Sequence, residues 1–294
     1  MNDSTVSSPA INLREAVKNL DALPAMPVIA QKLLALNTDT DQGERQMLLL
    51  VEQDPLISAK IISLSNAPIL GATRKISSIK DAAMLLGLKK IKSVATGIAM
   101  MSLKSKSSTG LLNLQDLWLH NLGIAFAMQA IVRAMPRTMR PADDQVFLAG
   151  MLHDIGYLAL AHLDPRRSDE LHTYLAARTK RPALQIERSI LEMSHDELGG
   201  ELARQWHLPD EIAMVIRFHH NPDVNDSVAK QPLVRMVYIA EKLLPSFGIN
   251  EYVEPGVSDA DWEALGIDAG MSEEIVGQIA EQADQAALFA ASFS

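Results

Sequence analysis

The sequence predicts an all-α fold made of two helical subdomains. Its apolar residues recur at intervals of three and four, as at Ile29, Leu33, Leu34 and Leu36, whereas strictly alternating runs are rare. Prolines fall between the periodic segments or in their first turn, so none removes a backbone N–H from the middle of a predicted helix. These two observations favour helices throughout and leave no segment that is typical of a β-strand.

The first hundred residues predict about five short helices. Asp54 before Pro55, and Ser78 three residues before Asp81, are typical of helix starts, and Gly87 is typical of a helix end. The predicted helices span about 11–21, 27–37, 43–53, 55–65 and 79–103, the last with a break near Gly87.

Residues 104–112 are small and polar with two lysines, a composition typical of a linker. We therefore expect an N-terminal helical subdomain over 11–103, a helical bundle over 113–246, and C-terminal helices over 258–290 that pack on the bundle. The helices predicted after the linker span about 113–134, 143–163, 167–178, 182–192, 195–206, 209–219, 231–244, 259–265 and 272–290.

Charge and composition narrow the classes of partner. The chain has 27 Lys and Arg against 36 Asp and Glu, a formal net charge of −9, and only 4% aromatic residues. Nucleic-acid binding needs a basic surface and often stacking rings, so a nucleic-acid partner is not expected. The first ten residues lack the basic start and apolar core of an export signal, and no run approaches the roughly 18 apolar residues of a membrane span. We expect a cytoplasmic protein with no membrane partner.

The chain has no cysteine, so any transition metal must be held by imidazole and carboxylate groups. His153 is followed by Asp154, and Glu241 lies on an apolar helix, where a carboxylate is costly to bury unless it is paired or bound to a cation. Five histidines fall where a metal site could be assembled: His120, His153, His195, His219 and His220.

A structural role is the alternative for each of these residues taken singly. A lone histidine on an apolar helix is more often a packing residue than a ligand, and we assign His162, His172 and His207 to that class. Glu241 alone could be a partly solvated edge residue. The His-Asp pair together with four further candidate segments favours a joint site.

The chain resembles the HDOD (HD-related output domain) family of bacterial signalling proteins, within the HD superfamily, from about residue 20 to 246. The resemblance rests on short motifs in both halves. They are Leu23-Pro24-Ala25-Met26-Pro27, Asp54-Pro55, Leu64-Ser65-Asn66, Ile76-Ser77-Ser78-Ile79, Leu86-Gly87, Trp118-Leu119-His120, the stretch from Ala149 to Gly156, His195, the stretch from Trp206 to Pro209, and His219-His220.

The superfamily resemblance implies an HD-type bundle in the C-terminal subdomain and metal-ligand positions at His120, His153 and Asp154. It also implies that His195, His219 and His220 can complete a two-metal version, with Fe, Mn, Zn or Mg as the possible divalent metal. Two positions depart from the superfamily pattern. Glu241 stands where that pattern has Asp, and Tyr157 stands where catalytic relatives tend to have Lys.

The HDOD resemblance implies a non-catalytic output module that acts through a signalling protein partner. Two alternatives remain. A metal-dependent phosphohydrolase acting on a nucleotide is favoured by the ligand set, although Tyr157 removes a cation that could hold a substrate phosphate. A DNA-binding regulator is suggested by Lys89, Lys90 and Lys92 after the Gly87 turn, although a solvated lysine face explains these charges equally well.

Overall fold

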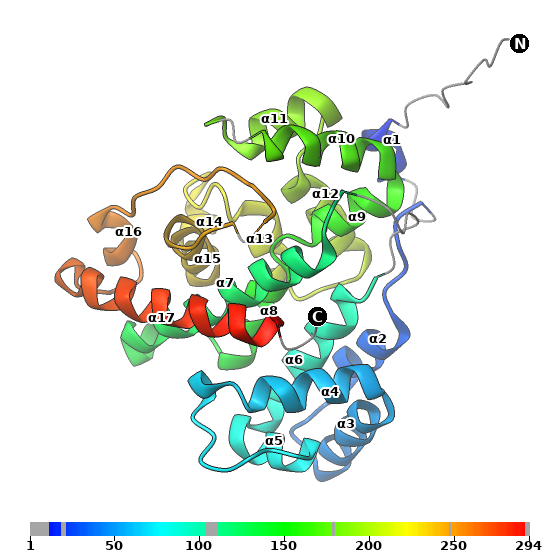
Figure 1. Cartoon of the computed structure of the whole chain (residues 1–294), viewed down its shortest axis with the longest axis vertical. Helices are drawn as coiled ribbons and strands as arrows, with labels where there is room; N and C mark the ends of the chain where they lie inside the picture. The colour runs from blue at the N-terminus through cyan, green and yellow to red at the C-terminus, as the bar shows by residue number, and fades with distance from the viewer. Residues whose placement is uncertain (1–11, 19–21, 104–110, 178–179, 247, 292–294) are drawn as a thin grey trace, which may run out of the picture.

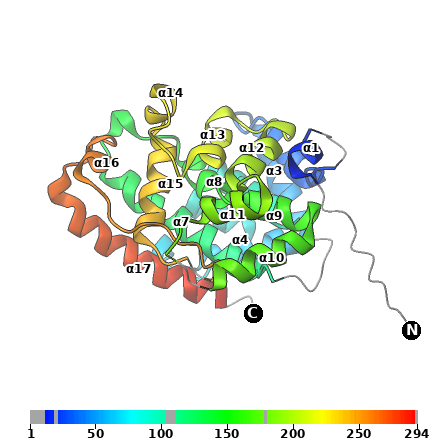
Figure 2. The ribbon, with the colours of Figure 1, turned by 90° about the horizontal axis from the view of Figure 1, so that it is seen from above.

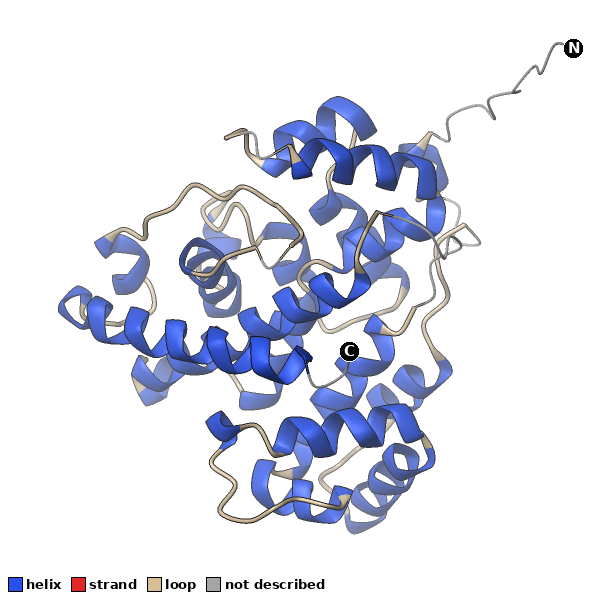
Figure 3. Cartoon of the chain, viewed as in Figure 1, coloured by secondary structure: helices blue, strands red, loops and turns tan. Residues whose placement is uncertain are grey.

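The protein is built from helices and connecting loops (Figure 3). The structure, a computed structural model, describes residues 12–18, 22–103, 111–177, 180–246 and 248–291, with side chains up to residue 281. None of these residues forms a strand, so the predicted all-α fold is confirmed. The prediction on the first ten residues, and most of the predicted linker over 104–112, lie outside the described residues.

The helices between residues 28 and 101 gather at one end of the molecule, in blue and cyan in Figure 1. The single turn at 13–16 lies apart from them, where Arg14 contacts Glu197. A helix predicted over 11–21 is a single turn, α1, within its described part. The elements are α1 (Leu13–Ala16), α2 (Val28–Ala35), α3 (Asp41–Gln53), α4 (Pro55–Ser65), the 3₁₀ turn η1 (Pro68–Leu70), α5 (Ile79–Leu86) and α6 (Leu88–Met101).

The caps expected from the sequence are present in this half. The Asp54 side chain accepts hydrogen bonds from the backbone N–H groups of Leu56 and Ile57, and Ser78 accepts one from Asp81. Gly87 has φ of +84°, a conformation that side chains other than glycine rarely adopt, and it separates α5 from α6 as predicted.

The second half surrounds two long central segments, α7 and the pair α8 and α9. Its elements are α7 (Leu114–Ala134), η2 (Arg137–Met139), α8 (Asp143–Leu152), α9 (Ile155–Leu163), α10 (Pro165–Ala176), α11 (Ala183–Leu191), α12 (His195–Gln205), α13 (Asp210–Phe218), α14 (Asp226–Ala229), α15 (Pro232–Leu243), α16 (Asp259–Glu263), η3 (Ala269–Met271) and α17 (Ser272–Ala291).

Helix α6 connects the two halves, because it packs on α2 in the first half and on α8 in the second. Helix α17, red in Figures 1 and 2, lies along α7. One hydrophobic cluster of buried residues continues from Leu13 to Ile279. The division into subdomains at 104–112 therefore stays a prediction, since both halves share this core.

The stretch Asp143–Leu163 is long and apolar enough to cross a membrane by length and composition. In the fold, however, 94% of its most apolar window is buried inside the protein. It contains α8 and α9 at the centre of the bundle, and this burial accounts for its apolar character.

Candidate metal centre

The His153–Asp154 pair lies at a junction between two helices. The pattern over 143–163 predicts one continuous helix, and this prediction is wrong: α8 ends at Leu152 and α9 begins at Ile155. At Asp154 the backbone ψ is 16°, which leaves the helical path. The buried apolar residues continue on both sides of the break, so periodicity could not reveal it.

Gly156 then brings α9 against α12. A Cβ atom at Gly156 would lie 1.9 Å from the carbonyl oxygen of His195, so only glycine permits this approach. The contact places His195, the first residue of α12, beside Asp154. The glycine after the His-Asp pair thus has a packing role that positions two candidate ligands.

Four buried side chains, from α7, the α8–α9 junction and α15, form the first group of possible ligands: His120, His153, Asp154 and Glu241. The Nε2 atoms of His120 and His153 are 3.2 Å apart. Glu241 Oε1 lies 3.0 Å from His153 Nε2 and 3.6 Å from His120 Nε2. Asp154 Oδ2 lies 3.4 Å and 3.5 Å from the same two nitrogens.

The second group comprises His195, His219 and His220. The Nε2 atom of His195 lies 3.3 Å from that of His219 and 3.1 Å from that of His220. Asp154 Oδ1 lies 3.3 Å from His195 Nε2 and 3.7 Å from His219 Nε2. Asp154 therefore stands between the two groups and presents one carboxylate oxygen to each.

The outer nitrogens of three rings fix their orientation. His153 Nδ1 donates to the carbonyl of Gly150 at 2.8 Å, and His219 Nδ1 donates to the carbonyl of Val215 at 3.1 Å. His195 Nδ1 lies 2.8 Å from Glu187 Oε1. An N–H at Nδ1 leaves the lone pair on Nε2 free, so these rings present Nε2 to the interior as a potential metal donor.

His220 differs, because carboxylates face both of its nitrogens. Its Nδ1 lies 3.4 Å from Glu241 Oε2, and its Nε2 lies 3.2 Å from Glu251 Oε1. Burial lowers the pKa of His220, but the two carboxylates outweigh burial and raise that pKa to about 9. Burial also lowers the pKa of His219 well below its usual value, and the neighbouring His220 reinforces the effect.

Glu187 is a residue of the site that sequence reasoning missed. Its carboxylate accepts hydrogen bonds from the backbone N–H of His195, at 2.8 Å, and from the Tyr157 hydroxyl, at 2.7 Å. Burial opposes ionisation, but His195 outweighs burial and lowers the pKa of Glu187 to about 2. The sequence contained an indication of this role, since Glu187 lies on a helix beside apolar residues, as Glu241 does.

Glu251 was also missed, and no pattern pointed to it. It lies in the loop after α15, beyond the predicted end of the bundle at 246. Its side chain is 2% exposed, and burial raises the pKa of its carboxyl group above the usual value. Only the folded chain brings this loop to the histidines.

Tyr157 is fully buried, and its hydroxyl donates to Glu187. Its ring stacks on the imidazole of His195, with centroids 4.4 Å apart and an interplanar angle of 22°. Tyr157 thus supports His195 through a ring contact and through their shared partner, Glu187.

The seven predicted residues fit a pair of divalent cations. Metal–donor bonds of about 2.0–2.2 Å place neighbouring donors about 2.8–3.6 Å apart in tetrahedral or octahedral geometry. The donor separations given above range from 3.0 to 3.7 Å, which matches this interval to within about 0.1 Å. Among the described residues, none donates a well-aligned hydrogen bond to either buried oxygen of Asp154. Such a carboxylate is costly to bury unless a cation neutralises it.

The histidines that we assigned to structural roles lie outside these groups. His172 is buried, donates from Nδ1 to the carbonyl of Ser168 at 2.7 Å, and packs edge-on against Tyr157. His207 is exposed after the end of α12, with φ of +51°. His162 also lies outside the described groups of possible ligands.

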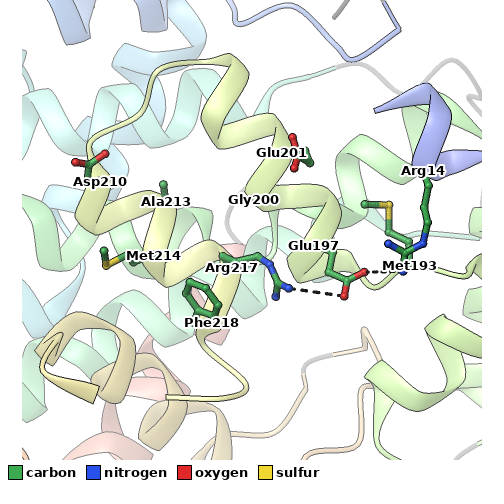
Figure 4. A pocket seen from close by; sticks show the side chains of 10 residues that line it. All are labelled: Arg14, Met193, Glu197, Gly200, Glu201, Asp210, Ala213, Met214, Arg217 and Phe218. Carbon is green, nitrogen blue, oxygen red and sulfur yellow. Dashed lines mark ion pairs between the residues drawn. The ribbon is translucent and has the colours of Figure 1, made fainter. Parts of the chain in front are cut away.

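A surface pocket of about 510 Å³ lies on the outer side of α12 and α13, the helices that carry His195 and lead into His219 (Figure 4). Glu197 lies between the guanidinium groups of Arg14 and Arg217, at 3.6 Å and 3.7 Å. Arg217 also contacts Asp196, the neighbour of His195, at 2.6 Å. Arg217 of the pocket is therefore connected to the candidate metal centre through its ion pair with Asp196, which is bonded to His195.

Comparison with known families explains this arrangement. A sequence model of the HDOD domain family matches residues 23–222, more than half of the chain. The chain belongs to the HDOD domain family. A curated relative, an uncharacterized protein of Treponema pallidum (strain Nichols), is 31% identical over 75 residues, which are 26% of this chain and 14% of that protein.

Solved structures of HDOD and related proteins share the fold. An HDOD domain protein of unknown function from Geobacter sulfurreducens is 26% identical, with a TM-score of 0.73 over 93% of this chain and 98% of that chain. A candidate signal transduction protein from Marinobacter aquaeolei VT8 is 24% identical, with a TM-score of 0.75, and this chain covers 64% of its length. A candidate metal-dependent phosphohydrolase from Shewanella amazonensis SB2B is 19% identical, with a TM-score of 0.65 over 95% of this chain and 97% of that chain.

Proposed function

We propose that this HDOD protein is a non-catalytic signal-transduction module whose metal centre is structural or ligand-sensing. Its ligands would be His120, His153, Asp154, His195, His219, His220 and Glu241. The observation that carries the proposal is the enclosure of a nearly complete ligand set around Asp154. The side chains of His153, Asp154 and His219 are 0% exposed.

The closed centre favours a role without turnover. A phosphohydrolase must admit a phosphate and then hold its charge, usually with a lysine or arginine. Among the described residues, no lysine or arginine lies within ion-pair distance of the Asp154 or Glu241 carboxylates. Tyr157, at the position where such a cation would be expected, is engaged with Glu187.

The phosphohydrolase alternative keeps one supporting observation, the two adjacent groups of ligands bridged by Asp154. A bound divalent metal would lower the pKa of a coordinated water and polarise a phosphate oxygen. The chain's own contribution would be limited to orienting the imidazoles through Gly150, Val215 and Glu187.

The DNA-binding alternative has less support, because two of its three lysines bind other parts of the chain. Lys89 pairs with Asp39 at 3.1 Å, and Lys90 donates to the Gln129 side chain at 3.1 Å. Lys92 donates to the carbonyl of Leu36 at 2.6 Å, at the end of α2. Lys90 and Lys92 are therefore engaged within the fold, whereas the side chains of Lys89 and Asp39 are 64% and 71% exposed. A phosphate backbone would thus meet one exposed lysine of the three.

We propose that the protein acts in the cytoplasm and passes its signal on by binding a protein partner. The pocket between α12 and α13 supports this proposal, because Arg217 connects it through Asp196 to the residue next to His195. A change in the metal centre that moves α12 would therefore alter this surface.

The decisive experiment is metal analysis of the purified protein, combined with turnover assays. Nucleotides and cyclic dinucleotides would be offered with added Mn²⁺, Fe²⁺, Mg²⁺ or Zn²⁺. We expect bound metal in the wild type and in His207→Ala, an exposed histidine that serves as the control, and loss of metal in His153→Ala and Asp154→Ala. We expect no hydrolysis. Turnover that disappears in Asp154→Ala would refute the non-catalytic role.

A further inference from the structure

We propose that Glu251 is an additional ligand of the second metal position. This inference rests on the proposed metal centre and extends it. Glu251 lies outside the stretch matched by the family model, 23–222, and outside the predicted bundle.

The geometry brings Glu251 to the second group. Its Oε1 atom lies 3.2 Å from His220 Nε2, which itself lies 3.1 Å from His195 Nε2. Possible ligand atoms of Glu251, His195 and Glu187 all lie within 4.8 Å of one another. The 3.2 Å between Glu251 Oε1 and His220 Nε2 is of the same size as the 3.3 Å between His195 and His219, so Glu251 occupies the place of a further donor around the same ion.

The carboxylate of Glu251 has no other described role. Its side chain is 2% exposed, and no described residue donates a well-aligned hydrogen bond to either of its oxygens. A buried, incompletely satisfied carboxylate that faces imidazole nitrogens is costly unless a cation neutralises it. Metal binding removes this cost.

The local chain is shaped to deliver Glu251 to this place. Gly248 and Asn250 have φ values of +100° and +61°, which turn the chain sharply after α15. The side chain of Ile249 is buried, with 2% of the residue exposed, and anchors the turn in the core. The next residue, Glu251, consequently enters the bundle instead of facing solvent.

Charge balance supports the same assignment. The described residues place four carboxylates in or directly against the cluster: Asp154, Glu187, Glu241 and Glu251. Together they match the charge of two divalent cations, whereas Asp154, Glu187 and Glu241 alone leave one positive charge uncompensated in a buried site.

The test is Mn²⁺ binding to the full chain, with Glu251→Gln as the variant and Glu254→Gln as the matched control. Glu254 is exposed on the same loop, three residues away. Stripped protein would be titrated with Mn²⁺ by calorimetry, and the electron paramagnetic resonance spectrum would report whether two ions are coupled through Asp154.

We expect two coupled Mn²⁺ ions in the wild type and in Glu254→Gln. In Glu251→Gln we expect the second ion to bind about a hundredfold more weakly, at the upper end of what removing a supporting carboxylate costs, and the spectrum to become that of an isolated ion. If Glu251→Gln fails to fold by circular dichroism, Glu251→Asp replaces it. The shorter carboxylate should then weaken only the second ion.

The possible failures are distinguishable. A wild type that binds no metal overturns the proposed metal centre, and with it this inference. A wild type that binds two ions while Glu251→Gln binds both with unchanged affinity overturns only the role of Glu251. Retention of both ions by the Gln variant would show that Glu251 is only a polar neighbour of His220, because an amide oxygen can keep that contact without the carboxylate charge.

Discussion

Replacing Gly156 with alanine should destabilise the fold and disturb the metal centre together. The added Cβ would lie 1.9 Å from the His195 carbonyl oxygen, where ordinary contacts begin at 3.4 Å. The obstacle is backbone and cannot rotate away, so α9 and α12 must separate by a distance on the order of the 1.5 Å difference between these two values. That displacement would also carry His195 away from Asp154, now 3.3 Å from it.

The expected magnitude follows from two opposing effects. Overpacking of this kind costs about 3 kcal/mol, and alanine gains about 1 kcal/mol over glycine in a helix. We therefore expect Gly156→Ala to lose about 2 kcal/mol of the free energy of unfolding. The control is Gly277→Ala in α17, where a Cβ atom meets nothing within 4 Å and should stabilise the protein.

Urea unfolding monitored by circular dichroism measures the free energy of unfolding of both variants. Titration with Mn²⁺ measures the metal affinity of the centre. The two substitutions should change stability in opposite directions, and only Gly156→Ala should weaken metal binding. Equal or greater stability of Gly156→Ala relative to the wild type would falsify the close packing of α9 on α12.

Three further predictions concern other contacts. Glu187→Gln should weaken metal binding about 10- to 100-fold without removing a ligand, because Glu187 orients His195. Titration with Mn²⁺ measures this affinity, and an unchanged value would contradict the prediction. Burial opposes ionisation of Asp261, but Ser258 and Arg235 outweigh burial and lower the pKa of its carboxyl group in the folded protein. Ionised Asp261 therefore stabilises the fold above the unfolded pKa of about 3.9. This stabilisation is lost as the pH falls through the lower folded pKa. The difference in urea stability between the wild type and Asp261→Asn should thus be larger at pH 6 than at pH 3, and an equal difference would contradict the assignment. Lys92→Met should lower the free energy of unfolding in urea by about 1 kcal/mol, since it removes a hydrogen-bond donor from the carbonyl of Leu36. Unchanged stability together with weaker binding to duplex DNA would instead favour the DNA-binding alternative.

The sequence by itself determined the all-α class and most helix positions, because periodicity and caps are local properties. Asp54, Ser78 and Gly87 act as predicted. The sequence also supplied the seven candidate ligands, partly through residue type and partly through the family resemblance. Whether they bind metal stays a prediction, as do the subdomain boundaries.

Only the tertiary structure decided which groups meet. The break at His153–Asp154 was hidden, since residues on both sides are buried whether the helix continues or turns. Glu251 follows α15 by eight residues and reaches His220 only because the chain turns at Gly248 and Asn250. Distances between side chains depend on how helices far apart in sequence pack, and that information is absent from any local pattern.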